Sequence, residues 1–361
     1  MYSVVNQDIA TLLARTPRLW GDLREASIFI TGGTGFFGTW LLEALLAANR
    51  KFALDCRVTA LSREPGRFAI KAPHLARDPA LTFIEGDVRS FEFPSGPVTH
   101  VIHAATESST TLNADDPQTM YEVCVEGTRR ALALAREKQA CHFLLTSSGA
   151  VYGRQPPEVT HIPEDFPFSP DQPGMRNAYA EGKRAAEELC IAASRPDADG
   201  GSVHATIARC FAFVGPHLPL DIHFAIGNFI RDALAGGPIR ISGDGTPYRS
   251  YLYAADLVEW LITILLRGGA GRAYNVGSEE AVSIRQLAER VAQVTAMVWP
   301  ERGRPEVLVA KQPGPGATAH RYVPNCDRAG GELGLAQATS LDEAISRTLR
   351  WGFESTQVSL P

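Results

Sequence analysis

The sequence predicts an α/β protein built on a doubly wound parallel sheet, with a smaller C-terminal α/β substrate-binding domain. A short apolar run at 28–30 leads into a glycine-rich turn and then into a segment with apolar residues at helical spacing. Strand-like and helix-like segments alternate from there to residue 146. This alternation is typical of parallel strands joined by helices that cover both faces of a sheet.

The elements can be placed in order along the chain. Residues 1–25 predict an amphipathic helix that packs against the first unit, with an interface helix as the alternative. Strands are expected at 28–30, 57–61, 81–84, 98–105 and 142–146, with a helix before the last of them. Beyond Gly215 we expect helices at 228–234, 283–294 and 340–351, a strand at 239–241 and a hairpin-like turn at 243–245. The last helix has Ser340 as its cap, with Glu343 three residues on.

These elements divide into two expected domains. A dinucleotide-binding domain covers 1–215 together with about 247–275, and a substrate domain covers 216–246 and 276–361. The 361 residues are enough to bury a sizeable core.

The composition excludes several classes of protein. With 45% hydrophobic and 21% charged residues, the chain reads as a soluble globular protein. A net charge of −5 without a basic run argues against nucleic acid as a partner. No apolar run reaches the roughly 18 residues of a membrane span, and the N-terminus lacks a signal-peptide pattern. Six scattered cysteines without C-x-x-C pairs indicate reduced thiols in a cytoplasmic protein and no metal site.

The glycine-rich turn predicts a dinucleotide site. Gly32, Gly35 and Gly38 follow the first strand with the spacing G-x-x-G-x-x-G and open a helix. The N-terminus of a helix offers unpaired N–H groups and a positive dipole end to a pyrophosphate. An ordinary strand–helix turn is the alternative. The residues expected to contact the cofactor here are Gly32, Thr34, Gly35, Phe36, Phe37 and Gly38.

The end of the second predicted strand favours NADP(H). A carboxylate at this point would bind the ribose hydroxyls of NAD, whereas an arginine accommodates the 2′-phosphate of NADP. The chain has Ser62 and Arg63 here, and the first acid is Glu64. NAD(H) remains the alternative.

Tyr179 and Lys183 predict acid–base chemistry. Four residues apart on a helix, they share one face. A neighbouring ammonium favours the phenolate, and Lys183 can also bind the cofactor ribose. Tyr179 would then exchange a proton with a sugar oxygen while a hydride moves to or from the nicotinamide.

With these motifs in order, the chain from about Ile28 to Trp351 resembles an extended short-chain dehydrogenase/reductase. It is similar to the NAD(P)-dependent epimerase/dehydratase family that acts on nucleotide sugars, which has a Rossmann-like fold. The other matching motifs are Gly86-Asp87, His103-Ala104-Ala105, the run from Ser147 to Gly153, Arg209 with Gly215-Pro216, Gly243-Asp244-Gly245 with Arg249, Tyr253 and Asp256, and Asn275-Val276-Gly277.

The resemblance implies a role for each matched position. Ser148 would hydrogen-bond the reacting oxygen, with Tyr179 as the acid/base and Lys183 as its partner. Asp87 and Val88 would meet the adenine, and Ala104 and Ala105 the nicotinamide. The nucleotide-diphosphate sugar would be held by Asn228, Arg249 and Arg321, since the fixed donors of an arginine match phosphate oxygens. The family also implies a homodimer formed through a four-helix interface.

Departures from the family pattern narrow the reaction. The segment from Tyr152 to Lys183 most resembles UDP-glucuronate decarboxylases, which, like 4,6-dehydratases, carry acidic groups just after the residue equivalent to Ser148. Here those positions are Gly149 and Ala150, which cannot titrate. Glu107 is the candidate for a compensating carboxylate near the substrate, and a solvent-facing glutamate is the alternative. Ala212 and Cys124 each replace an asparagine that is frequent in the family.

The predicted function is therefore oxidoreduction at a sugar carbon, expected to be C4, and reduction of a 4-keto nucleotide sugar fits best. A 4-epimerase with bound NAD is the alternative. The missing acids disfavour a 4,6-dehydratase or decarboxylase, and intact Tyr179 and Lys183 disfavour a non-catalytic dinucleotide-binding protein.

Overall fold

The computed structural model describes residues 3–105, 115–168, 177–198, 200–221, 224–314 and 319–358. Its centre is a seven-stranded sheet with the order β11-β6-β5-β4-β1-β2-β3, in which every neighbouring pair is parallel. The strands are β1 (Ser27–Thr31), β2 (Arg57–Ser62), β3 (Leu81–Glu85), β4 (His100–His103), β5 (His142–Ser148), β6 (Ala205–Cys210) and β11 (Ala273–Val276). The strand order reverses between β1 and β4, where such sheets bind ligands. The predicted fold class is confirmed.

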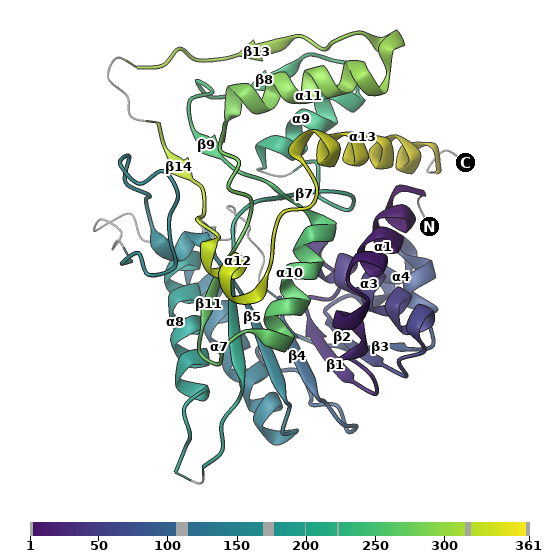
Figure 1. Cartoon of the computed structure of the whole chain (residues 1–361), viewed down its shortest axis with the longest axis vertical. Coiled ribbons are helices and arrows are strands. Elements are labelled where there is room, and N and C mark those ends of the chain that lie inside the picture. Colours follow the sequence, from purple (N-terminus) through teal and green to yellow (C-terminus); the bar gives the residue numbers. More distant parts are fainter. Residues whose placement is uncertain are drawn as a thin grey trace.

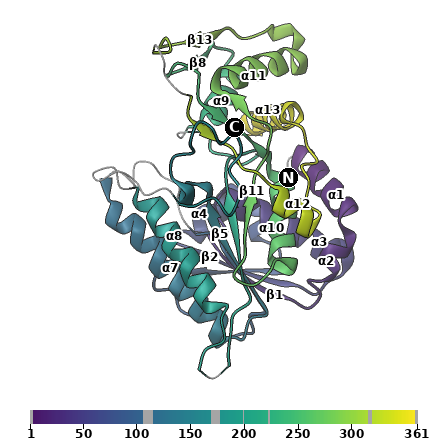
Figure 2. The same cartoon turned by 60° about the vertical axis from the view of Figure 1, so that its left-hand side comes forward.

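Helices cover both faces of this sheet (Figures 1 and 2). One face carries α7 (Pro117–Glu137) and α8 (Ala178–Ala193), and the other carries α3 (Phe36–Phe52) and α10 (Ala254–Arg267). Alternate residues of β1 show why: Ile28 and Ile30 belong to the core with α3 and α10, whereas Phe29 belongs to the core with α7 and α8. A strand buried on both faces must be apolar throughout.

Smaller elements connect or extend the sheet. They are α4 (Pro65–Lys71), α5 (Pro73–Ala76), the 3₁₀ turn η1 (Gly149–Tyr152), the parallel pair β7 (Phe213–Val214) and β10 (Leu252–Tyr253), and α12 (Asp327–Leu333).

The remaining elements lie beyond the carboxyl ends of the central strands (Figure 1). They comprise α9 (Ala225–Leu234), α11 (Ile284–Val298), η2 (Pro300–Arg302), α13 (Leu341–Val358), the parallel pair β8 (Ile239–Ile241) and β13 (Val307–Val309), and a three-stranded sheet β12 (Val282–Ser283), β9 (Tyr248–Arg249) and β14 (Arg321–Tyr322). The predicted cap at Ser340 forms, since its hydroxyl accepts a hydrogen bond from the Glu343 N–H, and Ser283 and Gln286 make a capping box at the start of α11.

The N-terminal segment packs as predicted but is not one helix. It forms α1 (Ser3–Arg15) and α2 (Pro17–Gly21), because Pro17 has no N–H to continue α1 and instead starts a new helix. The α1 helix lies against α3, α10 and α13. Tyr253 and Arg347 both donate to the buried carboxylate of Asp8, which fixes α1 to the rest of the chain.

Two other expectations were wrong in detail. The strand expected at 98–105 is limited to His100–His103. The turn at 243–245 does not join a hairpin, because β8 pairs with β13 and β9 pairs with β12 and β14. In the described part of the chain no helix is long and apolar enough to cross a membrane. All six cysteines are free thiols, and only Cys141 among them is exposed.

Candidate active site

The glycine-rich turn joins β1 to α3 by a very close approach of backbone segments. Gly32 has a φ of +70°, and a Cβ atom there would lie 2.6 Å from the carbonyl oxygen of Ala104. A Cβ atom on Gly38 would lie 2.3 Å from the carbonyl oxygen of Gly32. The α3 helix begins after Gly35 without a side-chain cap. Its first N–H groups therefore point out of the helix end, where a pyrophosphate would bind.

Thr31 positions the neighbouring end of β4. Its hydroxyl oxygen accepts hydrogen bonds from the N–H groups of Ala104 and Ala105, both at 3.1 Å. It also lies 2.8 Å from Nδ1 of His103, whose Nε2 lies 3.1 Å from the hydroxyl of Thr128. Burial lowers the pKa of His103 to about 3, so the imidazole is neutral. The residues predicted to meet the nicotinamide are thus fixed beside the glycine turn.

The predicted 2′-phosphate end lies at the carboxyl ends of β2 and β3. The hydroxyls of Thr34 and Ser62 are 3.3 Å apart, so the glycine turn and β2 meet here. Arg63 is exposed and near enough to Asp87 to lower the pKa of that carboxyl. The larger cause of this shift is Arg89, whose Nε and NH2 donate to the two carboxylate oxygens at 2.9 and 3.0 Å.

Ser148, Tyr179 and Lys183 meet at the end of β5. Ser148 is the last residue of β5, and its hydroxyl is hydrogen-bonded to that of Tyr179 on α8. Lys183 lies one turn further along α8, with Nζ 5.8 Å from the centre of the Tyr179 ring. Nζ donates to the carbonyl oxygen of Thr146 at 2.7 Å. The predicted catalytic residues are thus brought together.

Burial shifts the proton affinities of this group. It raises the pKa of the half-buried Tyr179 phenol, against which the hydrogen bond from Ser148 acts. It also lowers the pKa of the Lys183 ammonium, which is only 3% exposed. Both shifts follow from the cost of holding a charge away from water.

An aromatic wall fills the space beside Ser148 where an acid would stand. A Cβ atom on Gly149 would lie 2.7 Å from Cζ of Phe211, so no larger residue fits without moving that ring. The ring of Phe211 packs against Tyr322, with centres 4.7 Å apart. The hydroxyl of Tyr322 lies 3.5 Å from Oγ of Ser148, and burial raises the pKa of this phenol to about 12. Positions 149 and 150 therefore contribute no acid.

A buried polar network supports the floor of the site. Arg209, on β6, donates through Nε and NH2 to both carboxylate oxygens of Glu187 on α8, at 2.7 to 3.1 Å. Its NH1 donates to the hydroxyl of Tyr152 at 2.9 Å, and that hydroxyl donates to Oδ1 of Asn275 at 2.8 Å. Ser147 also donates to Glu187. Several motif residues therefore hold the ends of β5, β6 and β11 together.

The remaining predicted substrate residues lie on the elements beyond the sheet. Asn228 is half-buried on α9 and accepts a hydrogen bond from Arg231 at 3.2 Å. Arg249 of β9 has its guanidinium 5.8 Å from the centre of the Tyr322 ring, close to the wall. Arg321 instead stacks on Tyr248, 4.3 Å from the ring centre. Glu107 lies outside the described residues.

A family profile described as the NAD dependent epimerase/dehydratase family matches residues 28–277. The chain belongs to this family. Among curated relatives, UDP-glucuronic acid decarboxylase 1 of Arabidopsis thaliana is 29% identical over 328 residues, which cover 90% of this chain and 69% of the relative. Its namesakes in Xenopus tropicalis and Danio rerio are each 27% identical.

Solved structures of epimerase/dehydratase enzymes share the fold. The epimerase Mth375 of Methanothermobacter thermautotrophicus superposes with a TM-score of 0.76 at 22% identity, covering 94% of this chain and 96% of that one. DesIV, the dTDP-glucose 4,6-dehydratase of Streptomyces venezuelae with NAD and TYD bound, gives 0.73 at 23% identity, covering 92% and 98%.

Three residues at or below the candidate site of this epimerase/dehydratase family member were not predicted from the sequence: Tyr322, Phe211 and Glu187. Neither Phe211 nor Glu187 lies in a motif, and both act through packing or pairing. Tyr322 stands next to Arg321, which was selected for its charge, yet it is Tyr322 that reaches Ser148. Successive side chains of a strand point to opposite faces, so only one of residues 321 and 322 can face the site. This alternation is the signal that could have identified Tyr322.

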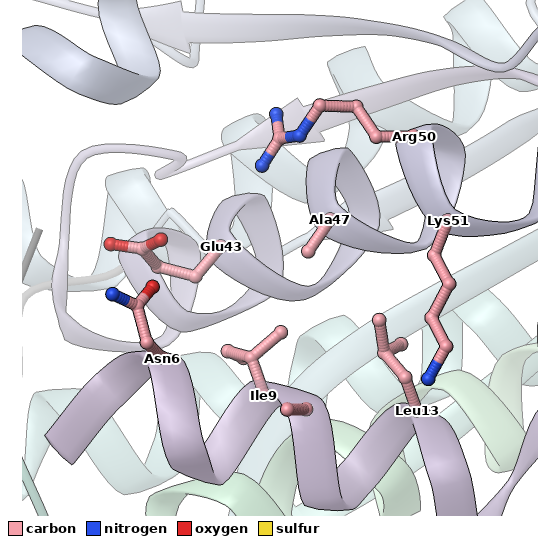
Figure 3. A pocket seen from close by; sticks show the side chains of 8 residues that line it. Asn6, Ile9, Leu13, Glu43, Ala47, Arg50 and Lys51 are labelled. Carbon is pink, nitrogen blue, oxygen red and sulfur yellow. The ribbon is translucent and has the colours of Figure 1, made fainter. Parts of the chain in front are cut away.

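A separate groove of about 380 Å³ lies between α1 and α3 (Figure 3). Ile9 and Leu13 line it from α1, whereas Glu43, Arg50 and Lys51 line it from α3. Glu43 is buried and lies 2.7 Å from Nε2 of His74. None of the candidate active-site residues borders this groove.

Proposed function

We propose that this protein transfers a hydride between a nicotinamide cofactor and a sugar carbon, C4, of a nucleotide-diphosphate sugar, and that its net reaction is reduction of a 4-keto sugar. The observation that carries this proposal is the group formed by Ser148, Tyr179 and Lys183 at the end of β5, beside Gly149, where a larger residue would have to displace Phe211. This group suffices for hydride and proton transfer but lacks a second acid–base pair.

The nicotinamide, when bound, supplies the hydride that reaches the keto carbon. Ser148 holds the carbonyl oxygen, and Tyr179 donates its proton to that oxygen, which turns the ketone into an alcohol. The Tyr179 phenol is protonated at neutral pH and so has a proton to donate, although burial, which raises its pKa, makes it a weaker acid. Lys183 then stabilises the phenolate until it is reprotonated.

The substrate would bind between the sheet and the elements beyond it. We assign nucleotide-sugar binding to 216–246 and 276–361, and cofactor binding to 1–215 with about 247–275. Arg249 would bind the diphosphate and Asn228 the nucleotide, with Arg321 as a second cation for either. This assignment places the sugar between Arg249 and Ser148, both of which lie close to Tyr322.

The cofactor we propose is NADP(H), within a family described as NAD dependent. Ser62 and Thr34 leave a small polar corner at the end of β2, and Arg63 follows it. The N–H of Glu64 donates to the Ser62 hydroxyl, while the Glu64 carboxylate pairs with Arg67 at 3.4 Å. That carboxylate is therefore directed to Arg67.

Two other reactions have specific support. A 4-epimerase uses the same three residues, and epimerases are part of the family's description. Decarboxylation of UDP-glucuronic acid is supported by the names of the relatives that align over most of the chain. Against it stands the absence of a titratable group at Gly149 and Ala150.

One set of incubations tests these alternatives. Purified protein is given NADPH with a 4-keto nucleotide sugar, and the loss of NADPH absorbance is followed. The reductase proposal expects stoichiometric consumption of NADPH and a 4-hydroxy product. Conversion of UDP-glucose to its C4 epimer without net change in cofactor would replace it with the epimerase, and release of CO₂ from UDP-glucuronic acid would replace it with the decarboxylase.

We also propose that the protein is a homodimer through α7 and α8. These helices pack against each other on one face of the sheet, where Figure 2 shows them at the outside of the molecule. Tyr121 on α7 is 40% exposed, as expected of a large side chain that a second copy would cover.

A further inference from the structure

The N-terminal helix α1 lies where the elements around the sheet meet the elements beyond it (Figure 1). It contacts α3 and α10, which cover the sheet, and also α13, which packs on α9 and α11. Both α1 and α13 lie outside the residues 28–277 that match the family profile. Their contact is therefore not part of the matched region.

One buried carboxylate of α1 accepts hydrogen bonds from both sides of this contact. Oδ2 of Asp8 accepts from the hydroxyl of Tyr253 at the start of α10, and Oδ1 accepts from NH1 of Arg347 on α13. The guanidinium of Arg347 also lies 5.5 Å from the centre of the Tyr253 ring. That ring packs edge-on against Trp40 of α3. Asp8 thus joins α13 to two helices that cover the sheet.

Two further contacts of α1 lie on either side of this carboxylate. At the last residue of the helix, NH2 of Arg15 donates to Oδ1 of Asp256 on α10 at 3.1 Å. Oδ2 of Asp256 accepts from the N–H of Thr339, just before α13, at 2.8 Å. At the first residue, the hydroxyl and the N–H of Ser3 donate to the carboxylate of Glu354 on α13. The contacts therefore run along the whole of α1, in antiparallel order along α13.

The interior of this contact is polar. A cavity of about 130 Å³ lies between α1, α10 and α13, and its charged lining includes Asp8, Arg15, Asp256 and Arg347. Burial raises the pKa of Asp8, although its two hydrogen bonds lower it, so the charge is held at a cost in free energy. Apolar replacements of such buried ionic groups are often neutral or stabilising. A need for one fixed arrangement explains this group better than stability does.

We propose that α1 is a clamp between the two halves of the protein, formed by Ser3, Asp8 and Arg15, and that Asp8 is a positioning residue for nucleotide-sugar binding. By holding Arg347, Asp8 sets α13, and with it the α9 helix that carries Asn228, at one position relative to the sheet. The nucleotide sugar would bind across both halves, whereas the dinucleotide would bind to the sheet side alone. The clamp therefore prearranges only the first of these sites. This inference rests on the proposed function.

Hydrogen exchange tests the clamp without any ligand. We expect Asp8→Asn to speed amide exchange in α13 about 5- to 10-fold, the effect of one lost hydrogen bond, and to leave β1 and α3 unchanged. The matched control is Asp78→Asn, because Asp78 accepts from Arg50 and from the N–H of Ala80, all on the sheet side. Equal exchange of α13 in wild type and Asp8→Asn would overturn the clamp.

Ligand binding tests the positioning role. Calorimetry first finds which of UDP, dTDP and GDP the NADP-loaded protein binds. Asp8→Asn should weaken that diphosphate about 5- to 10-fold and leave the Kd for NADPH unchanged, whereas Asp78→Asn should change neither. Equal weakening of both ligands by Asp8→Asn, or of neither, would overturn the positioning role and leave the proposed function intact. Failure of the wild type to bind any of the three diphosphates would instead overturn the proposed function, and hydrogen exchange alone then decides the clamp.

If Asp8→Asn does not fold, Glu354→Gln replaces it. This change weakens the contact with Ser3 at the exposed end of the clamp. It should speed amide exchange in α13 without changing β1, and an unchanged rate in α13 would contradict the proposal.

Discussion

A Cβ atom on Gly149 would lie 2.7 Å from Cζ of Phe211, and that ring in turn packs on Tyr322 with centres 4.7 Å apart. The first of the two positions that follow Ser148 is therefore crowded by packing, and the second is the non-titratable Ala150. The wall formed by Phe211 and Tyr322 makes this side of the site apolar except for one hydroxyl.

Gly149→Ala should destabilise the protein, because the added methyl group must displace Phe211. Overpacking of this kind costs about 1–3 kcal/mol of the free energy of unfolding. The double variant with Phe211→Leu should recover most of that loss, since the smaller side chain vacates the space. Denaturant unfolding of the three variants measures it. A double variant as unstable as the sum of the two single variants would contradict the contact.

Tyr179→Phe should abolish turnover without abolishing cofactor binding. Losing the proton donor lowers kcat by about 10²–10⁴-fold, and Ser148→Ala, which removes one donor to the reacting oxygen, by about 10²-fold. NADPH binding, followed by its fluorescence, should stay unchanged in Ser148→Ala. Tyr274→Phe is the control and should keep full activity. Unchanged activity in Tyr179→Phe would argue for a non-catalytic protein.

Arg63→Ala should weaken the binding of NADPH and leave the binding of NADH unchanged. One charge-assisted hydrogen bond to a phosphate is worth about 1.5–3 kcal/mol, so the Kd for NADPH should rise at least tenfold while that for NADH does not change. Arg67→Ala is the matched control: Arg67 is exposed and pairs with Glu64. An equal effect of Arg63→Ala on both cofactors would refute the preference for NADP(H).

Acid should destabilise the fold through three buried histidines. Burial lowers the pKa of His100 to about 4 and those of His103 and His217 to about 3, below the value near 6.5 of an unfolded chain. The unfolded chain therefore takes up protons first. The contribution of these histidines to the free energy of unfolding is fully present above pH 6.5. It falls by up to about 1.4 kcal/mol per pH unit for each histidine as the pH drops toward 4.

Urea unfolding between pH 7 and pH 5 measures this slope. His103→Gln should remove the contribution of one of the three histidines to the slope of the unfolding free energy against pH. His320→Gln, at an exposed position, should leave the slope unchanged. The prediction fails if stability is flat over this interval or if both variants behave like the wild type.

Arg209→Met should be severely destabilising. It leaves the Glu187 carboxylate, which is 2% exposed, without its main partner, and breaking a buried pair costs about 3–5 kcal/mol. The control is Arg272→Met: the pair of Arg272 and Glu332 is at the surface, where such pairs contribute about 0–1 kcal/mol. Similar losses in the two variants would show that the buried network does not stabilise the sheet.

The fold was predictable because its signals are local. Apolar runs, the glycine turn and helical spacing each lie within about twenty residues, and their alternation implies a parallel sheet. Pro17 also indicates the break in the N-terminal helix, because proline has no N–H to continue it. The bounds of β4 and the pairing of β8 and β9 were not predictable, because partners distant in the chain determine them.

Only part of the candidate site could be predicted from the sequence, because only part of it consists of residues that lie close together in the chain. Ser148, Tyr179 and Lys183 lie close in sequence and in a recognisable motif. Tyr322 is 174 residues from Ser148 and reaches it through a strand of two residues, which has no periodicity to detect. The pairing of Arg209 with Glu187 likewise depends on how β6 and α8 pack, and no local pattern encodes it.

The indole of Trp40, on the second turn of α3, donates to the carbonyl oxygen of Pro216 at 2.7 Å, and both Tyr253 and His217 pack edge-on against it. The helix that opens at the glycine turn is thereby tied to the point where the chain leaves the sheet. A displacement of Pro216 would therefore also disturb the helix at whose N-terminus the pyrophosphate is proposed to bind.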